Sequence, residues 1–127
     1  MTGRRVLAIV DDLMVRSRIE AAAASTGSQV EFPLDVADLE YKLRQKPDLI
    51  VVGLAATRKP WPDWISRIKA HPVAGQAPLY AFGPHTDLEL RRRALEHGAD
   101  RVLANSAFFL QLGRILTGDA PERDDEE

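Results

Sequence analysis

The residues of this chain best suited to chemistry are two adjacent carboxylates, Asp11 and Asp12, which directly follow a short apolar run. Adjacent carboxylates raise each other's cost of ionisation unless a cation or a hydrogen-bond donor compensates. A divalent cation is one solution, although two carboxylates and water make only a weak Mg²⁺ site. Together with His85, which follows another apolar run, they would form a two-carboxylate, one-histidine set that suits a transition metal.

A structural role for the same residues is the more frequent case. One carboxylate of the pair would cap the helix that follows, where its charge favours the positive end of the helix dipole. Arg16 or Arg58 would then screen the other carboxylate. A histidine in a turn is far more often a surface or capping residue than a ligand. We therefore expect no cofactor, with a weak Mg²⁺ site as the alternative.

The rest of the sequence lacks the combinations of residues that catalysis requires. It contains no nucleophile paired with a base, no glycine-rich phosphate motif and no cofactor signature. There is no cysteine, which excludes disulfides and thiolate metal sites. We therefore expect a protein that is not an enzyme.

Five short apolar runs alternate with helical patterns along the chain. Residues 6–10 are wholly apolar, as in a strand buried on both faces of a parallel sheet. The other predicted strands are residues 29–32, 49–52, 79–82 and 102–104. Five strands, each followed by a helix after a short connection, predict an α/β fold in which helices cover both faces of a parallel sheet.

Each segment between these strands carries the signals of a helix. Gly27 ends the first helix and Asp35 caps the second. Thr86 and Glu89 form a capping box at the start of the fourth helix, and Ser106 caps the last one. The core positions predicted for the third and the last helix are Trp64, Ile65, Ile68, Phe109, Leu112, Ile115 and Leu116.

The predicted site is the edge of the sheet where the strands end. A doubly wound sheet binds its ligand at the carboxyl ends of its strands. The residues at those ends are Asp11, Asp12, Gly53, Gly83 and Asn105. Only three of the five carry a functional group on the side chain.

Four segments of the sequence resemble the CheY-like receiver domain of two-component signalling. VLAIVDD is similar to the family's first strand with its acidic pair, and PDLIVVGL to its third strand. IKAHPVAGQAPLYAFG is similar to the passage from the third helix into the fourth strand, and LEHGADRVLANSAFF to the segment around the fifth strand. The likeness runs without gaps from about Arg4 to Leu116. It implies a flavodoxin-like, doubly wound sheet of five parallel strands in the order 2-1-3-4-5, with five helices.

The resemblance also implies roles for the residues at the strand ends, and the sequence departs from most of them. Receivers accept a phosphoryl group on an aspartate that ends the third strand and that holds Mg²⁺ with the acidic pair. A hydroxyl and a lysine bind the phosphoryl oxygens. Those three positions are Gly53, Gly83 and Asn105 here, and the family's switch aromatic and its proline correspond to Val102 and Thr57. Because these residues supply neither a nucleophile nor a positive charge, we expect a degenerate receiver that is not phosphorylated.

Charge is distributed unevenly along the chain. The net charge is −2, but residues 119–127 contain six acids and one base, and the remaining residues carry about +3. We expect a receiver-like domain at residues 1–117 and a disordered acidic tail at residues 118–127. A charge of about +3 is too small to indicate nucleic-acid binding. No apolar run approaches the roughly 20 residues of a membrane helix, and the start lacks a secretory pattern, so we expect a cytoplasmic protein without membrane contact.

These features predict a protein–protein interaction module in bacterial-type signalling. Receivers commonly bind partners or pair with themselves through the fourth helix, fifth strand and fifth helix, and we expect no output domain after that helix. The exposed residues predicted for interaction are Arg91, Arg92, Arg93, Phe108, Gln111 and Trp61. The acidic tail is a candidate to fold back onto the three arginines. The alternative is a small-molecule or metal-binding flavodoxin-like domain that uses Asp11, Asp12 and His85.

Overall fold

A five-stranded parallel sheet forms the centre of the computed structural model, which describes residues 3–55 and 57–122. The strands are β1 (Arg5–Ile9), β2 (Gln29–Glu31), β3 (Leu49–Gly53), β4 (Leu79–Gly83) and β5 (Arg101–Ala104). They lie in the order β2-β1-β3-β4-β5, and every pairing is parallel. The predicted strand order is confirmed.

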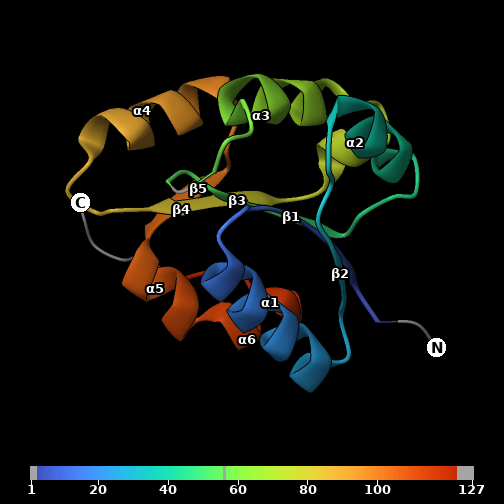
Figure 1. Ribbon diagram of the computed structural model, residues 1–127, viewed down its shortest axis with the longest axis horizontal. Coiled ribbons are helices and arrows are strands. Elements are labelled where there is room, and N and C mark those ends of the chain that lie inside the picture. Colours follow the sequence, from blue (N-terminus) through green and yellow to red (C-terminus); the bar gives the residue numbers. More distant parts are fainter. Residues whose placement is uncertain (1–2, 56, 123–127) are drawn as a thin grey trace.

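Helices cover both faces of this sheet (Figure 1). One face carries α2 (Val36–Leu43), α3 (Trp61–Ala70) and α4 (Leu88–His97). The other face carries α1 (Leu13–Thr26), α5 (Asn105–Leu110) and α6 (Leu112–Leu116), and a 3₁₀ helix, η1 (Ala74–Gln76), precedes β4. Within residues 3–55 and 57–122, no helix is long and apolar enough to cross a membrane.

The wholly apolar strands divide their side chains between the two layers. All five residues of β3 are buried. Ile50 and Val52 pack in the layer under α2 and α3, whereas Leu49 and Val51 pack in the layer under α1 and α6. Successive side chains of a strand point to opposite faces, so a sheet covered on both faces needs apolar residues at every position.

Local signals set most helix ends, with one correction. Gly27 follows α1 at φ 74°, and Asp35 accepts a hydrogen bond of 2.8 Å from the Asp38 N–H at the start of α2, both as predicted. The capping box predicted at Thr86 is wrong. Asp87 caps α4 instead and accepts a hydrogen bond of 3.1 Å from the Leu90 N–H, because an aspartate satisfies a free helical N–H and also suits the dipole.

The last helix also differs from the prediction. It begins at Asn105, directly after β5, so Ser106 is not its cap, and it is interrupted at Gln111 to give α5 and α6. Gly113 lies in the first turn of α6, where the low helix propensity of glycine weakens a continuous helix. In the described residues the sheet is therefore covered by six α-helices instead of five.

The first part of the predicted disordered tail is ordered. Pro121 is buried, and its carbonyl oxygen accepts a hydrogen bond of 2.8 Å from the Arg101 guanidinium on β5. The prediction of disorder for residues 118–127 is therefore wrong for residues 119–122. The composition of this acidic segment indicates disorder, but hydrogen bonds from Arg101 on β5 hold its backbone in place. Residues 123–127 lie outside the described residues, as do residues 1, 2 and 56.

The burial of Phe108 leads to a prediction about stability. Phe108 is 0% exposed and stacks on Phe82, with ring centroids 4.0 Å apart. We expect Phe108→Ala to lower the free energy of unfolding by about 3–5 kcal/mol in chemical denaturation. Leu110→Ala is the matched control, because Leu110 lies on the same helix but is 87% exposed, and its cost should stay within about 0.5 kcal/mol. Equal costs for the two variants would contradict the burial of Phe108.

Candidate functional site

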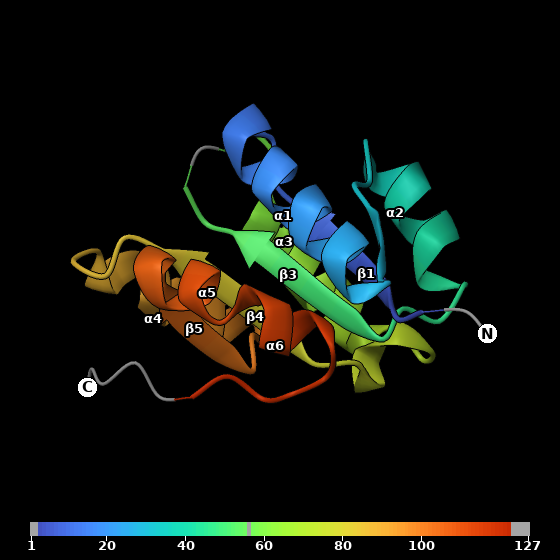
Figure 2. The same ribbon diagram turned by 90° about the horizontal axis from the view of Figure 1, so that it is seen from below.

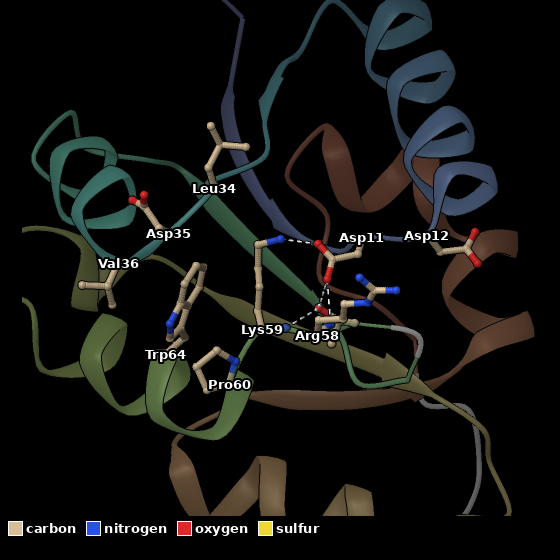
Figure 3. Close-up of a pocket in the computed structure, with 10 residues that line it drawn as sticks. Asp11, Asp12, Leu34, Asp35, Val36, Arg58, Lys59, Pro60 and Trp64 are labelled. Carbon is tan, nitrogen blue, oxygen red and sulfur yellow. Dashed lines mark hydrogen bonds and ion pairs between the residues drawn. The ribbon is translucent and has the colours of Figure 1, made fainter.

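Asp12 serves as the cap of α1. Its Oδ1 accepts a hydrogen bond of 3.0 Å from the Val15 N–H, and its backbone is extended. In Figure 3 its carboxylate points away from that of Asp11. The prediction that one carboxylate of the pair caps the following helix is confirmed.

Asp11 binds the loop between β3 and α3. Its Oδ2 accepts hydrogen bonds of 3.0 Å from the Thr57 hydroxyl and 2.6 Å from the Arg58 N–H. Its Oδ1 forms an ion pair with the Lys59 ammonium, as the dashed lines in Figure 3 show. The Lys59 side chain is only 16% exposed, so its charge is held close to the carboxylate.

Lys59 is a functional residue that the sequence analysis missed. The prediction that Arg16 or Arg58 screens the second carboxylate is wrong. The Arg16 guanidinium lies 4.3 Å above the Phe32 ring, and Arg58 binds Asp11 through its backbone N–H. A basic side chain in the loop that faces the acidic pair was the signal available in the sequence.

The environment of Asp11 favours its charged form. Partial burial by itself would raise the pKa of Asp11, but hydrogen bonds from Lys59, the Arg58 N–H and Thr57 outweigh it and lower the pKa below its ordinary value. Asp11 is therefore ionised at neutral pH and keeps its ion pair with Lys59.

A pocket of about 970 Å³ opens beside this ion pair. Its apolar wall comes from Trp64 and from the loops that precede α2 and α3 (Figure 3). The complete lining is Asp11, Asp12, Leu34, Asp35, Val36, Thr57, Arg58, Lys59, Pro60 and Trp64. The acidic pair thus faces a space with a polar floor and an apolar wall.

Gly53 ends β3, as predicted, and the side chains of Val10 and Phe82 crowd its Cα. A Cβ atom at this position would lie 2.9 Å from Val10 Cγ1 and 3.2 Å from the Phe82 ring. Contacts that short force a neighbour to move. A side chain at position 53 would therefore require Val10 or Phe82 to shift.

A second pocket, of about 760 Å³, contains Gly53 and Asn105 without the acidic pair. Its lining is Val15, Arg18, Gly53, Ala55, Phe82, Asn105, Ser106, Phe109 and Leu110. Gly83 is buried, and a Cβ atom there would lie 3.3 Å from Leu54 Cβ. The five residues predicted to form one site therefore divide between two pockets and a packed position.

Three phenylalanines fill the space between β4 and α5. Phe82 stacks on Phe108, and Phe109 meets Phe82 edge-on with centroids 5.7 Å apart. The Arg18 guanidinium lies 3.9 Å above the Phe109 ring. The prediction that Phe108 is an exposed interaction residue is wrong, because packing against Phe82 turns it inward and leaves Phe109 half-buried.

His85 is exposed, and the structure does not bring it to the acidic pair. Within the described ranges, no three His, Cys, Asp or Glu side chains lie close enough together to hold a metal ion. The three-residue metal site offered as an alternative is therefore not assembled, because Asp12 is engaged at α1 and Asp11 at the β3–α3 loop.

The arginines predicted for interaction lie on α4, where the partners of Arg92 and Arg93 belong to the fold itself. Arg92 forms ion pairs with Glu89 and Glu96, its neighbours on the same helix. The Arg93 guanidinium lies 5.3 Å above the Trp61 ring. Trp61 is 6% exposed, so its predicted role as an exposed interface residue is wrong, whereas the predicted core position of Trp64 is confirmed.

Two exposed leucines on α4 were also missed. Leu88 is 71% exposed and Leu95 is 51% exposed. A separation of seven residues places them on the same face of the helix, two turns apart. Their spacing was visible in the sequence, but the sequence did not show which apolar residues of this helix stay outside the core.

Comparisons with known proteins identify the fold. No protein-family model matches the chain, and neither does any curated protein. The receiver domain of a sensor histidine kinase from Pseudomonas aeruginosa, solved with magnesium in its active-site cleft, superposes with a TM-score of 0.76 at 23% identity, over 91% of this chain and 95% of that one.

Two response regulators have TM-scores close to that of the Pseudomonas receiver domain. The one from Hahella chejuensis has a TM-score of 0.75 at 19% identity, over 90% of this chain and 92% of that one. A chemotaxis response regulator of Vibrio cholerae has a TM-score of 0.73 at 17% identity, over 91% and 99%. The chain has the CheY-like fold of response-regulator receiver domains.

Proposed function

We propose that this protein is a phosphorylation-independent receiver-like module that acts by binding another protein. The observation that carries the proposal is the packing at Gly53, where even a Cβ atom would lie 2.9 Å from Val10 Cγ1 and 3.2 Å from the Phe82 ring. Phosphoryl transfer depends on positioned charges and a nucleophile. Gly53 and Gly83 supply neither, and Asn105 is uncharged, so the proposal includes no catalytic role.

The ion pair between Lys59 and Asp11 supports the same proposal. An acidic pair needs a compensating positive charge, and in the Pseudomonas receiver domain a magnesium ion lies in the cleft. Here the Lys59 ammonium supplies that charge from within the chain. Because Gly53 offers no ligand and Asp12 caps α1, Asp11 is the carboxylate that remains, and a Mg²⁺ site built on it would be weak even without Lys59.

The proposed contact surface comprises the outward faces of α4, β5 and α5. On α4 the exposed Leu88 and Leu95 supply apolar area, and Arg92 lies between them along the helix. An exposed apolar stripe beside charged side chains is typical of a surface that docks a partner. We infer that the partner presents an apolar patch that covers these leucines.

A small-molecule role is the second candidate. The pocket of about 970 Å³ beside Asp11 has the size of a ligand site, with an apolar wall that includes Trp64. This candidate does not depend on His85. The metal experiment described below separates the metal-binding form of this alternative from the leading proposal.

Phosphorylation tests the leading proposal directly. With acetyl phosphate and Mg²⁺, intact-mass spectrometry should show no phosphoryl adduct on the wild-type protein. Gly53→Asp should also stay unmodified, and the crowding at Val10 and Phe82 should lower the free energy of unfolding by about 1–3 kcal/mol or more.

Two alanine variants control for crowding alone. Gly53→Ala should destabilise the protein, whereas Gly113→Ala, with open space around its Cβ, should be neutral or stabilising by up to about 1 kcal/mol. A hydroxylamine-sensitive adduct on the wild-type protein would overturn the proposal, because it would show that another carboxylate accepts the phosphoryl group.

The ion pair between the Lys59 ammonium and Asp11 leads to a prediction about metal dependence. Wild-type melting temperature should not change in about 10 mM Mg²⁺, because Lys59 already compensates Asp11. Lys59→Met should gain Mg²⁺-dependent stability on the order of 1 kcal/mol, and Lys59→Met/Asp11→Asn should lose that gain. Strong stabilisation of the wild type by Mg²⁺, Mn²⁺ or Zn²⁺ that disappears in Asp12→Asn would instead favour the metal-binding alternative.

The contact surface is tested by capture of partners from the native cell, quantified by mass spectrometry. Leu88→Glu/Leu95→Glu should reduce capture of the main partner at least about tenfold, which corresponds to about 1.4 kcal/mol. Leu13→Glu is the control, because Leu13 is 78% exposed but lies on α1. Unchanged capture by the α4 variant together with loss in Leu13→Glu would place the interface on the opposite side of the sheet.

A further inference from the structure

The chain turns back on itself after α6. Gly118 adopts φ 110°, and its N–H donates to the Ile115 carbonyl oxygen at 3.1 Å. In Figure 2 the segment that follows, drawn in red, runs back past α6 and beside β5. We refer to residues 118–122 as the returning segment.

Side chains from β5 and from the junction of α5 and α6 bind the backbone of the returning segment. The Arg101 guanidinium on β5 donates to the carbonyl oxygens of Pro121, at 2.8 Å, and Glu122, at 3.2 Å. The Gln111 side-chain oxygen accepts a hydrogen bond of 2.6 Å from the Glu122 N–H. Three hydrogen bonds therefore reach the main chain of two consecutive residues, whatever side chains those residues carry.

Charge and burial add selectivity to this backbone recognition. Arg114 on α6 lies 2.9 Å from the Glu122 carboxylate and 3.6 Å from that of Asp119. Pro121, between these two acids, is buried against the domain. The preferred ligand is therefore an extended segment with a proline and an acidic residue on either side of it.

We propose that Arg101, Gln111 and Arg114 form a binding site for an extended acidic peptide and that the chain's own returning segment occupies this site. A partner protein that presents such a peptide would bind by displacing residues 119–122. Ion pairs at an exposed surface weaken with salt, and a tethered segment competes at an effective concentration on the order of millimolar, so the segment is held but remains displaceable.

This inference deepens the proposed function and rests on it for its biological role. Gln111 was predicted as part of the interaction surface, and here its side chain accepts a hydrogen bond from Glu122. Arg101 belongs to β5, the strand at the edge of the sheet. The returning segment therefore covers the β5 and α5 side of the proposed contact surface and controls access to it, while leaving Leu88 and Leu95 on α4 exposed.

The first experiment measures whether the segment is held. The chain has no cysteine, so Ala120→Cys in the full chain provides a single position for a fluorophore. Time-resolved anisotropy should show slow local motion of the dye, and Arg101→Ala/Arg114→Ala should make it fast. Arg92→Ala is the matched control, because Arg92 pairs within α4 and should leave the motion unchanged. Equally fast motion with and without Arg101 and Arg114 would overturn the proposal.

The second experiment measures binding of a separate peptide. Asp119→Lys/Glu122→Lys should free the site, because Arg114 would then face positive charge. A labelled synthetic peptide, GDAPERDDEE, should bind this variant at least about tenfold more tightly than it binds the wild type. Adding Arg114→Glu to the variant should abolish binding, as should exchanging the acids of the peptide for lysines.

The outcomes distinguish this inference from the proposed function. Absence of peptide binding to the freed variant would overturn the peptide site even if the returning segment proves to be held, because the contact would then be only an internal brace. Neither anisotropy nor peptide binding depends on the cellular partner. Failure of partner capture through Leu88 and Leu95 would therefore contradict the proposed function while leaving both readouts interpretable.

Discussion

Phe82 lies across the carboxyl end of β3 because residue 53 has no side chain to keep it away. The ring then stacks on Phe108 and meets Phe109 edge-on, and this cluster joins α5 to the sheet. An aspartate at position 53 would have to move Val10 or the ring, because even its Cβ atom would crowd them. The small size of Gly53 therefore governs how Phe82 and α5 pack at this end of the sheet.

At the end of the neighbouring strand β1, charged side chains determine the arrangement instead of apolar packing. Asp11 holds the loop after β3 through the Thr57 hydroxyl, the Arg58 N–H and the Lys59 ammonium. These bonds anchor the loop to the end of β1. On β5, Val102 is buried at 5% exposure in the layer that faces α3 and α4.

The exposed surface of the domain depends on which side chains of α4 and β5 already have partners within the fold. On α4, Arg92 and Arg93 are engaged by Glu89, Glu96 and Trp61, so the arginine run is part of the fold as well as of the surface. The exposed apolar area of that helix comes from its leucines. At the edge strand β5, hydrogen bonds from Arg101 hold the returning chain beside the sheet.

The sequence by itself determined the parallel α/β sheet covered on both faces, and its resemblance to receiver domains implied the strand order and the absence of a phosphoryl acceptor at Gly53. Wholly apolar strands and end signals such as Gly27 and Asp35 are local patterns, and the chemistry missing at Gly53 is a property of the residue type. Tertiary structure alone decided that Phe108, and not Phe109, faces the core, because Phe82 from another strand selects between neighbouring positions on the helix. It also decided that Lys59 pairs with Asp11 and that Arg101 holds Glu122, since long flexible side chains find partners remote in sequence only once the fold has placed them.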